Sequence, residues 1–485
     1  MTDAGGAEHV LAIDQGTSGT KAVVVDGGGR ASAVVEVPVH VDHGTDGSVE
    51  VDPEVLWRSV VDAGKRALAA AGHPRLAAVA LANQGETVLA WDRTSGRPLS
   101  RAVVWQDGRS QQVCDRLAAA GHGPRLAQLT GLVLDPYFVA PKLAWLREHV
   151  TTEGVVTTTD VWFIHRLCGA FVTDAATASR SLLMDLDTVT WAAEAVEAFG
   201  LGGEVLPRIV ANDVVVGETG VFGASVPVVG LCVDQQAALF AESCLDPGDT
   251  KCTYGTGAFL LAGTGGVPVR SSSGLVGCVA WKLSDDTVNW CLDGQVFTVG
   301  SAVTWLQQMG IISAPTDLDA LGGAVADSGG AVFVPGLAGL GAPFWAPTAK
   351  GAFVGLTLAI TRRQLVRSAV EGIAAQVAWL ARCVAADLGR PLTRLRVDGG
   401  LTRSALLCQL QADLAQVPVE RYPSPHATAL GVAAFARLGL GMTGSPAEAV
   451  GGWEPDGTFE PQMSADEAAS TLEAWRSVAD AVATW

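Results

Sequence analysis

Two short hairpins of similar sequence, one in each half of the chain, constrain the fold more than any other feature. Residues 9–26 read as an apolar strand ending in Asp14, a tight turn rich in Gly, Thr and Ser, and a returning strand. Residues 250–262 repeat this arrangement around a Gly-Thr-Gly turn at 255–257. Such turns expose backbone N–H groups that can bind phosphate, although an ordinary polar hairpin has the same composition. The repeat predicts two α/β domains of the same topology.

The length of the chain agrees with two domains. Its 485 residues exceed what one hydrophobic core usually organises. Turn-forming residues cluster at 245–248, shortly before the second hairpin. We therefore expect an N-terminal domain of residues 1–245 and a C-terminal domain of residues 246–485.

Composition limits the partners of the protein. With 49% hydrophobic and 17% charged residues, the chain is typical of a packed globular protein. The formal net charge of −18 argues against nucleic-acid and anionic-membrane binding, which need clustered Lys and Arg. The nine cysteines include no C-x-x-C pair, residues 1–8 do not resemble a signal peptide, and no window has the roughly 18 uninterrupted apolar residues of a membrane span. We expect a cytoplasmic protein with reduced thiols.

One carboxylate stands at a strand-to-helix corner. The apolar strand predicted over residues 226–233 runs directly into an apolar helix, and Asp234 is the corner residue. An α/β fold opens its ligand crevice at such junctions, so Asp234 is suited to act as a general base. Gln235 and Gln236 follow and can hydrogen-bond a polyhydroxylated ligand. Asp is also a favoured helix cap, and this simpler interpretation of Asp234 remains open.

Polar clusters follow several other predicted strands. Residues 83–86 (Asn-Gln-Gly-Glu) follow a strand expected over 76–82, and Trp105 lies beside another strand end. The Asp-Gly-Gly run at 398–400 follows a short strand and precedes a helix expected from about Thr402. A glycine-rich strand-to-helix turn can hold an anion or the phosphates of a nucleotide, though the same run also occurs as a plain turn. These clusters outline a candidate active-site rim.

Helix-capping residues predict two long helices. The first is expected over residues 52–71, with Asp, Pro and Glu in its first turn, and the second over 361–389, which opens with a capping box and ends at Gly. Residues 107–196 have mainly helical spacing. Residues 466–485 read as an amphipathic helix that can pack on its own domain or on a partner.

Motifs of other enzyme classes are absent. The sequence contains no H-E-x-x-H, no Cys/His set at zinc spacing, no G-x-S-x-G elbow, no Walker A motif and no convincing dinucleotide fingerprint. Metal hydrolases, serine hydrolases and dehydrogenases are therefore disfavoured.

The ordered motifs resemble those of the FGGY family of carbohydrate kinases, with the glycerol kinases as the nearest branch. They extend from about residue 9 to residue 440: I-D-Q-G-T-S, N-Q-x-E-T, V-W-Q-D, D-P-Y-F, D-Q-Q-A-A-L-F, Y-G-T-G-x-F, G-L-G-A-P-F-W and V-D-G-G. The resemblance implies two actin-like (RNase H-like) α/β domains with a nucleotide cleft between them. It also implies transfer of the γ-phosphoryl group of ATP to a hydroxyl of a small polyol or sugar, which requires positioning and charge neutralisation.

The resemblance assigns expected roles to individual positions. Asp234 would be the catalytic base, and Asp14 would hold Mg²⁺. The positions that would contact ATP are Thr17, Ser18, Lys21, Thr256, Gly257, Gly300, Thr304, Gly400 and Ser404. Lys21, Thr304 and Ser404 differ from the residues common in glycerol kinases, which affects individual contacts more than ATP binding as a whole.

The acceptor-binding positions include two departures from the glycerol kinase pattern. The matching positions are Gly85, Glu86, Trp105, Tyr137, Asp234, Gln235 and Phe259. Gly85 and Gly108 stand where glycerol kinases carry Arg. Loss of a multi-donor guanidinium removes an orienting contact and opens volume. We therefore expect a larger or differently hydroxylated acceptor such as erythritol or xylulose, or weak use of glycerol.

Two alternatives to an active kinase remain on the sequence alone: an actin-like ATPase, and a catalytically weak family member kept for binding or regulation. The same fold serves actin-like ATPases that have no small-molecule acceptor, and fold by itself does not separate them from kinases. The proposed base and the polar and aromatic rim favour the kinase. The sequence does not decide whether the protein forms a homo-oligomer.

Overall fold

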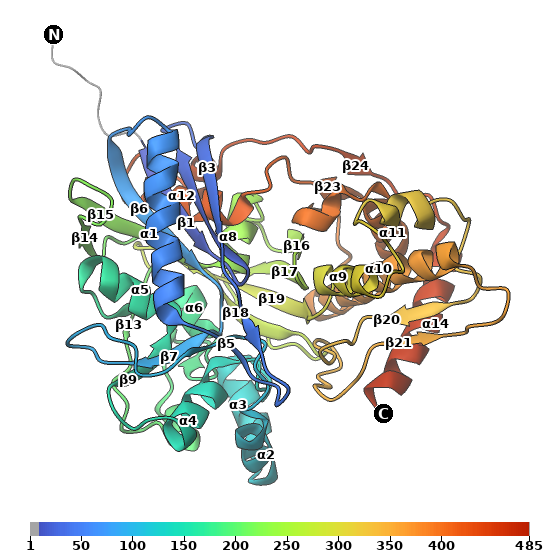
Figure 1. Ribbon diagram of the computed structural model, residues 1–485, viewed down its shortest axis with the longest axis horizontal. Coiled ribbons are helices and arrows are strands. Elements are labelled where there is room, and N and C mark those ends of the chain that lie inside the picture. Colours follow the sequence, from blue (N-terminus) through green and yellow to red (C-terminus); the bar gives the residue numbers. More distant parts are fainter. Residues whose placement is uncertain (1–8, 485) are drawn as a thin grey trace.

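The computed structural model describes residues 9–484, so residues 1–8, where no signal peptide is expected, lie outside the described part. The chain forms two α/β halves, each built on a mixed sheet (Figure 1). The first sheet has the order β14-β15-β6-β1-β2-β3. Its strands are β1 His9–Gln15, β2 Gly19–Val25, β3 Ala31–Pro38, β6 Leu76–Asn83, β14 Gly217–Thr219 and β15 Val226–Val233.

The second sheet has the order β18-β19-β17-β16-β22-β23-β24. Its strands are β16 Thr250–Tyr254, β17 Ala258–Gly265, β18 Val276–Lys282, β19 Val288–Val296, β22 Leu395–Asp398, β23 Val419–Arg421 and β24 Thr458–Phe459. In both sheets a hairpin strand (β1 or β16) pairs antiparallel on one side and parallel with a later strand (β6 or β22) on the other. The predicted repeat of topology is confirmed.

Smaller sheets lie around these two. A five-stranded sheet has the order β4-β5-β8-β7-β9, and three two-stranded sheets pair β10 with β13, β11 with β12 and β20 with β21. Their strands are β4 Asp42–His43, β5 Val49–Val51, β7 Val88–Trp91, β8 Ala102–Val103, β9 Val155–Thr158, β10 Val172–Asp174, β11 Met184–Asp185, β12 Thr190–Trp191, β13 Arg208–Val210, β20 Val332–Val334 and β21 Ala352–Val354. Four of these short strands interrupt the region expected to be mainly helical.

Helices cover both faces of each large sheet. They are α1 Pro53–Ala70, α2 Gln111–Ala119, α3 Gly123–Thr130, α4 Val139–His149, α5 Thr159–Cys168, α6 Ala175–Ser179, α7 Ala193–Ala198, α8 Asp234–Ala241, α9 Gly300–Gln308, α10 Arg362–Leu388, α11 Ala405–Ala415, α12 Ala427–Gly439, α13 Pro446–Val450 and α14 Ala465–Ala483. A π turn (Leu318–Gly322) and a 3₁₀ turn (Gly400–Arg403) complete the elements used below.

The predicted helix caps are confirmed. The Asp52 side chain accepts the Glu54 N–H at the start of α1, and α10 opens with the Thr361–Gln364 capping box and ends at Gly389 with φ 64°. By length and composition α10 could cross a membrane, but 72% of its apolar window is buried inside the protein, so it serves as a core helix. One expected boundary is wrong: α11 begins after Ser404 because a 3₁₀ turn follows the Gly-Gly pair and Ser404 caps the Leu407 N–H.

The two sheets are joined by a shared helical layer. Alternate residues of the first sheet pack against α1 on one face and against α8 and α12 on the other, and side chains of β17, β18 and β19 enter that second core as well. The far face of the second sheet packs on α10, α11 and α14. The C-terminal helix α14 therefore packs on its own half, which decides between the two options that its sequence left open.

Helix α12 belongs to the first half although it lies near the end of the chain, and Figure 1 shows it beside β6 and β1. Glycines permit this close packing. A Cβ at Gly431 would lie 1.9 Å from the Ala237 carbonyl oxygen, and one at Gly230, where φ is +83°, would lie 2.3 Å from the Val432 carbonyl oxygen. Phe435 stacks on Phe240 of α8 at 4.0 Å.

Candidate active site

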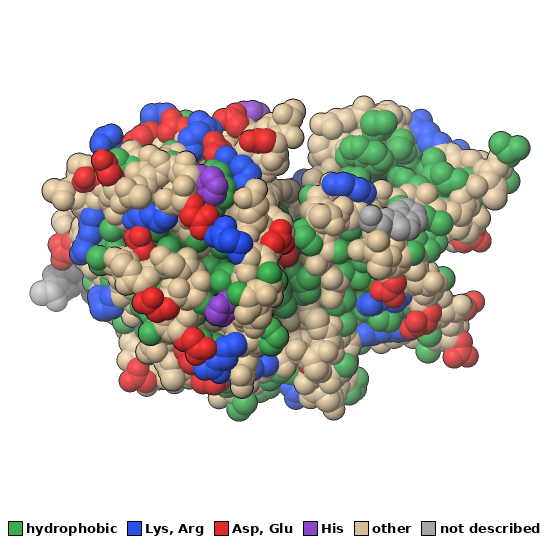
Figure 2. Space-filling model, turned by 90° about the horizontal axis from the view of Figure 1, so that it is seen from below, with side chains coloured by type: hydrophobic (Ala, Val, Ile, Leu, Met, Phe, Trp, Pro, Cys, Tyr) green, Lys and Arg blue, Asp and Glu red, His purple; other side chains and the backbone are tan. Residues whose placement is uncertain are grey.

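Two adjoining cavities line the cleft: the first lies between the two halves, and the second lies in the second half. The first, of about 250 Å³, is lined by the turn after β1, the start of α8 and the turn between β16 and β17. The second, of about 1280 Å³, lies between α9 and the turns around residues 318 and 400. Gly255, Thr256 and Gly400 line both cavities. The surface is also hollowed between the two lobes in Figure 2.

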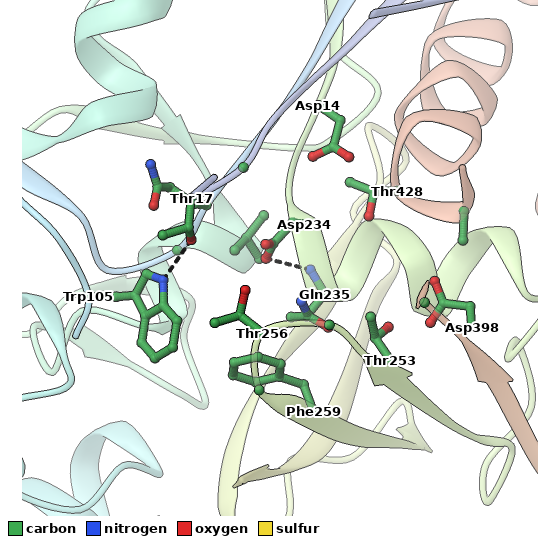
Figure 3. Close-up of a pocket in the computed structure, with 18 of the residues that line it drawn as sticks. Asp14, Thr17, Trp105, Asp234, Gln235, Thr253, Thr256, Phe259, Asp398 and Thr428 are labelled. Carbon is green, nitrogen blue, oxygen red and sulfur yellow. Dashed lines mark hydrogen bonds between the residues drawn. The ribbon is translucent and has the colours of Figure 1, made fainter. Parts of the chain in front are cut away.

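Asp234 occupies the corner between β15 and α8, as predicted. Val233 is the residue that precedes the helix in extended conformation, and no side-chain cap bond forms there. Asp234 Oδ1 instead accepts the N–H of the adjacent Gln235 at 2.7 Å, so Asp234 starts the helix without capping its later N–H groups (Figure 3). Burial, reinforced by the nearby Asp14 and Glu86 charges, raises the pKa of Asp234 to about 7. A carboxyl group with that pKa can accept a proton near neutral pH.

Asp14 and Lys21 lie opposite each other in the β1–β2 register, on either side of the first hairpin turn. Burial raises the pKa of Asp14 to about 6, and the Lys21 charge only partly opposes this rise. Thr17 in the same turn accepts a hydrogen bond from Trp105 Nε1 at 2.9 Å (Figure 3). The first hairpin therefore carries a carboxylate and a cation, and its turn is hydrogen-bonded to the indole of Trp105.

A buried arginine orders the inner end of the first cavity. Arg180, 3% exposed at the end of α6, donates through Nε to Glu86 at 2.6 Å, through Nη1 to Asp293 of β19, and through Nη2 to the Tyr137 hydroxyl at 3.2 Å. Glu86 has φ of +55°, a conformation that non-glycine residues seldom adopt. Since buried ionised side chains need partners, this network fixes Glu86 and Tyr137 at the cavity wall.

Aromatic rings form one side of the first cavity. Trp105 packs edge-on against Tyr137 at 5.9 Å and against Phe259 at 6.0 Å, and Phe297 lies 5.5 Å from Tyr137. Carboxylates and amides of Glu86, Asp234 and Gln235 line the same cavity. A surface with apolar rings and polar groups matches a polyol, whose C–H and O–H groups face in different directions.

Glycines shape both cavities, with Gly257 in the first and Gly300 in the second. A Cβ at Gly257 would lie 2.5 Å from the Val296 carbonyl oxygen, and one at Gly300 would lie 2.4 Å from the Gly255 carbonyl oxygen. These contacts hold the N-terminus of α9 against the turn, where the N–H groups of Val299 and Gly300 donate to the Thr256 and Gly255 carbonyls. The turn and helix can thus approach a nucleotide only because side chains are missing.

Two hydroxyls expected at the nucleotide are already engaged. Thr304 Oγ1 donates to the Gly300 carbonyl within α9 at 3.1 Å. Ser404 donates to Asp319 and caps α11, and Asp319 also accepts the N–H of Leu406 at 3.1 Å. Both hydroxyls line the second cavity but are less available to a ligand than their sequence positions suggest.

All seventeen positions expected from the sequence line these two cavities. The first cavity takes Asp14, Thr17, Ser18, Lys21, Gly85, Glu86, Trp105, Tyr137, Asp234, Gln235, Phe259, Thr256, Gly257 and Gly400. The second takes Gly300, Thr304 and Ser404 and shares Thr256 and Gly400. Gly108, the second departure from the glycerol kinase pattern, lines a separate cavity of about 100 Å³ behind Trp105 and Tyr137.

Several important side chains had no signal in the sequence. Arg180 follows an Ala- and Ser-rich stretch, and its carboxylate partners lie 94 and 113 residues away. Lys251 is fully buried in β16, where nothing in the sequence predicts a cation. Asp398 lies in the predicted Asp-Gly-Gly turn, but only the structure brings its side chain to the cavity wall (Figure 3).

Comparison with known proteins agrees with this arrangement. Residues 9–241 match the N-terminal domain and residues 250–440 the C-terminal domain of the FGGY family of carbohydrate kinases. The chain is 40% identical to a glycerol kinase from Bordetella parapertussis, over 99% of this chain and 98% of that protein, and 41% identical to one from Myxococcus xanthus, over 97% and 98%. The crystal structure of Plasmodium falciparum glycerol kinase with ADP superposes with a TM-score of 0.88 at 28% identity over 98% of each chain. The chain belongs to the FGGY family of carbohydrate kinases.

Proposed function

We propose that this carbohydrate kinase transfers the γ-phosphoryl group of ATP to a hydroxyl of a small polyol, with Asp234 as the general base. The observation that carries the proposal is Asp234 at the β15–α8 corner, with a pKa of about 7, in a cavity lined by rings and hydrogen-bonding groups. A base with this pKa accepts the hydroxyl proton as the hydroxyl oxygen attacks phosphorus. Full-length similarity to glycerol kinases supports glycerol or a close relative as the acceptor.

The acceptor would be held by groups of opposite hydrogen-bonding character. The Glu86 and Asp234 carboxylates accept hydrogen bonds from hydroxyls, and the Gln235 amide can donate to a hydroxyl oxygen. The Arg180 network fixes Glu86, since its guanidinium contacts both Glu86 and the Tyr137 hydroxyl, and its charge opposes the burial that raises the pKa of Glu86. Trp105 and Phe259 would pack on the carbon chain of the acceptor.

ATP would extend from the second cavity into the first. Gly257, Gly300 and Gly400 allow its phosphates to approach the backbone, and Thr17, Ser18 and Lys21 approach from the opposite hairpin. In the described residues no group of three or more His, Cys, Asp or Glu side chains converges as a metal site. Mg²⁺ usually keeps water and phosphate ligands and needs only one or two carboxylates, so Asp14, which lines the first cavity, fits this role. The ion would neutralise phosphate charge.

In this proposal the two parts of the chain have different roles. Residues 1–245 would supply the base and most of the acceptor site, and residues 246–485 most of the nucleotide site. A cytoplasmic location remains a prediction from the sequence, and the sequence leaves the oligomeric state open.

A larger acceptor is the second candidate, and Gly85 favours it. A Cβ built at Gly85 would lie 3.0 Å from Val233 Cγ2, so the wall of the cavity here is backbone and one methyl group. Erythritol, a pentitol or a ketopentose such as xylulose would reach this wall, whereas glycerol would leave part of the cavity to water. Preference for such an acceptor over glycerol would confirm the expectation drawn from Gly85.

The test is ADP release from Mg-ATP across glycerol, erythritol, threitol, the pentitols, xylulose, ribulose and gluconate. One acceptor should turn over well, and Asp234→Asn should lower that turnover by roughly 10²–10⁴-fold while ATP still binds. Asp62→Asn on the exposed side of α1 is the matched control and should leave turnover unchanged. An active Asp234→Asn variant would refute the assignment of the base, and no response to any acceptor would favour an actin-like ATPase.

A further inference from the structure

Lys251 connects the second half of the molecule to the acceptor site. It lies on β16 of the second sheet with no exposed surface. Its Nζ donates to Gln235 Oε1 at 2.9 Å and to Thr253 Oγ1 at 2.7 Å. Gln235 follows Asp234 in α8 and lines the first cavity, so a cation from one half of the molecule contacts an acceptor-site side chain of the other half.

The chemistry of an ammonium group decides how the Gln235 amide is oriented. An ammonium has three donors and no acceptor, so it can contact only the oxygen of an amide. With Oε1 held by Lys251, the Nε2 group of Gln235 and its two N–H donors are left for other partners. No contact within the described part of the chain uses Gln235 Nε2 as a donor.

The surroundings keep Lys251 in this position. Burial raises the pKa values of Asp398 and Glu242, and the Lys251 charge opposes the rise in both. Thr253 on the same strand takes a second N–H of the ammonium. A buried cation with acidic neighbours and two fixed hydrogen bonds has little freedom to leave Gln235.

We propose that Lys251 is a positioning residue that orients the Gln235 amide, so that Gln235 presents only N–H donors to the acceptor. The inference rests on the proposed function, since Gln235 must contact the acceptor. A hydroxyl that donates its proton to Asp234 or Glu86 then uses its oxygen to accept from Gln235. An acceptor with an ether in place of this hydroxyl keeps the bond from Gln235 but loses the bond to the carboxylate, and one with a methylene loses both, so both bind weakly.

A double-mutant cycle tests the proposal. Lys251→Met, Gln235→Met and the double variant are compared by steady-state kinetics with the best acceptor, at a pH about two units above the Asp234 pKa so that the base stays ionised. We expect each single variant to raise the acceptor KM roughly tenfold, as for one lost hydrogen bond, with ATP KM nearly constant. The double variant should be no worse than Gln235→Met. Lys282→Met, a lysine on β18 with a surface ion pair to Asp286, is the matched control.

Gln235→Glu keeps the test valid if Lys251→Met does not fold. A carboxylate at 235 adds a negative charge that pairs with Lys251 and keeps this lysine in place, but it carries no N–H donor, so the acceptor KM should rise as in Gln235→Met. Normal acceptor binding by Gln235→Glu, or independent additive effects of Lys251→Met and Gln235→Met, would overturn the proposal. If no acceptor turns over with the unaltered protein, the proposed function fails instead.

Discussion

The two hairpin turns that face the cleft share a topology and differ in chemistry. The first has Asp14 before its turn and Lys21 after it, and Asp234 lies nearby at the end of a strand of the same sheet. The second turn offers Thr256, labelled in Figure 3, together with Gly257 and the backbone of the turn. One half can therefore accept protons and bind cations, whereas the other can approach phosphates closely. The repeated topology gives the cleft two similar hairpins, and a few turn residues make them chemically different.

The turns also differ in how tightly they pack. A Cβ at Gly16 would lie 3.3 Å from the Gly19 carbonyl oxygen, which a small shift can relieve, whereas a Cβ at Gly257 would lie 2.5 Å from the Val296 carbonyl oxygen. The second hairpin turn can therefore pack closely only because it lacks side chains, whereas the first hairpin contributes ionisable side chains to the cleft. The following predictions test this distinction.

The largest effect on ATP binding or stability is expected for a substitution in the second hairpin turn, between β16 and β17. Gly257→Ala places a methyl group against backbone that cannot move alone, so the ATP KM should rise by roughly 100-fold or the protein should lose about 2–3 kcal/mol of stability. Titration with ATP and thermal unfolding measure the two outcomes. Gly16→Ala is the matched variant and should raise the ATP KM by no more than about fivefold. Equal effects of both variants would contradict the difference in packing.

The pH dependence of the reaction should follow the ionisation of Asp234, beside the first hairpin. Because the pKa of Asp234 is about 7 and the base must be ionised, kcat/KM for the acceptor should fall about tenfold per pH unit below 7. A pH profile at saturating Mg-ATP measures this limb. A lower inflection would mean that bound Mg²⁺ stabilises the ionised form. A profile independent of pH down to about 5 would show that another group is the base.

A smaller effect is expected on stability. Folding raises the pKa of Asp234 above its ordinary value of 3.8, so its contribution to stability is complete below that value and is lost as pH rises through about 7. Asp234→Asn cannot ionise and should raise the free energy of unfolding by about 2 kcal/mol near pH 8, with less than half of this gain near pH 5. Urea unfolding at the two pH values measures it. A gain independent of pH would point to packing and not to charge.

Local patterns in the sequence predicted much of the fold and the site. The repeated hairpins, Asp234 at its corner and the α10 capping box all depend on neighbours within a few residues, and the structure contains each of them. The three-dimensional partners of Arg180 and Lys251 lie far away in sequence, so no window could reveal them. The short strands of the five-stranded sheet are equally hard to predict, because two to four residues carry little periodicity.

The placement of α12 could not be predicted for a different reason. Its Ala-rich sequence would suit burial against either sheet, and the glycines that allow the close approach to α8 and β15 acquire meaning only when both partners are known. The sequence motifs shared with the family extend to α12, but they do not indicate on which half of the molecule this helix packs.

The return of α12 to the first half has a consequence during synthesis. One face of the first sheet stays only partly covered after β15 and α8 have been made, because Ala427–Gly439 follows roughly 200 residues later. At typical elongation rates of about 5–20 residues per second, this interval lasts roughly 10–40 seconds. Throughout that time an apolar surface of β1, β6 and β15 is open to the ribosome-bound chain and to chaperones. A ribosome that stalls within the second half would release a protein in which neither half is finished.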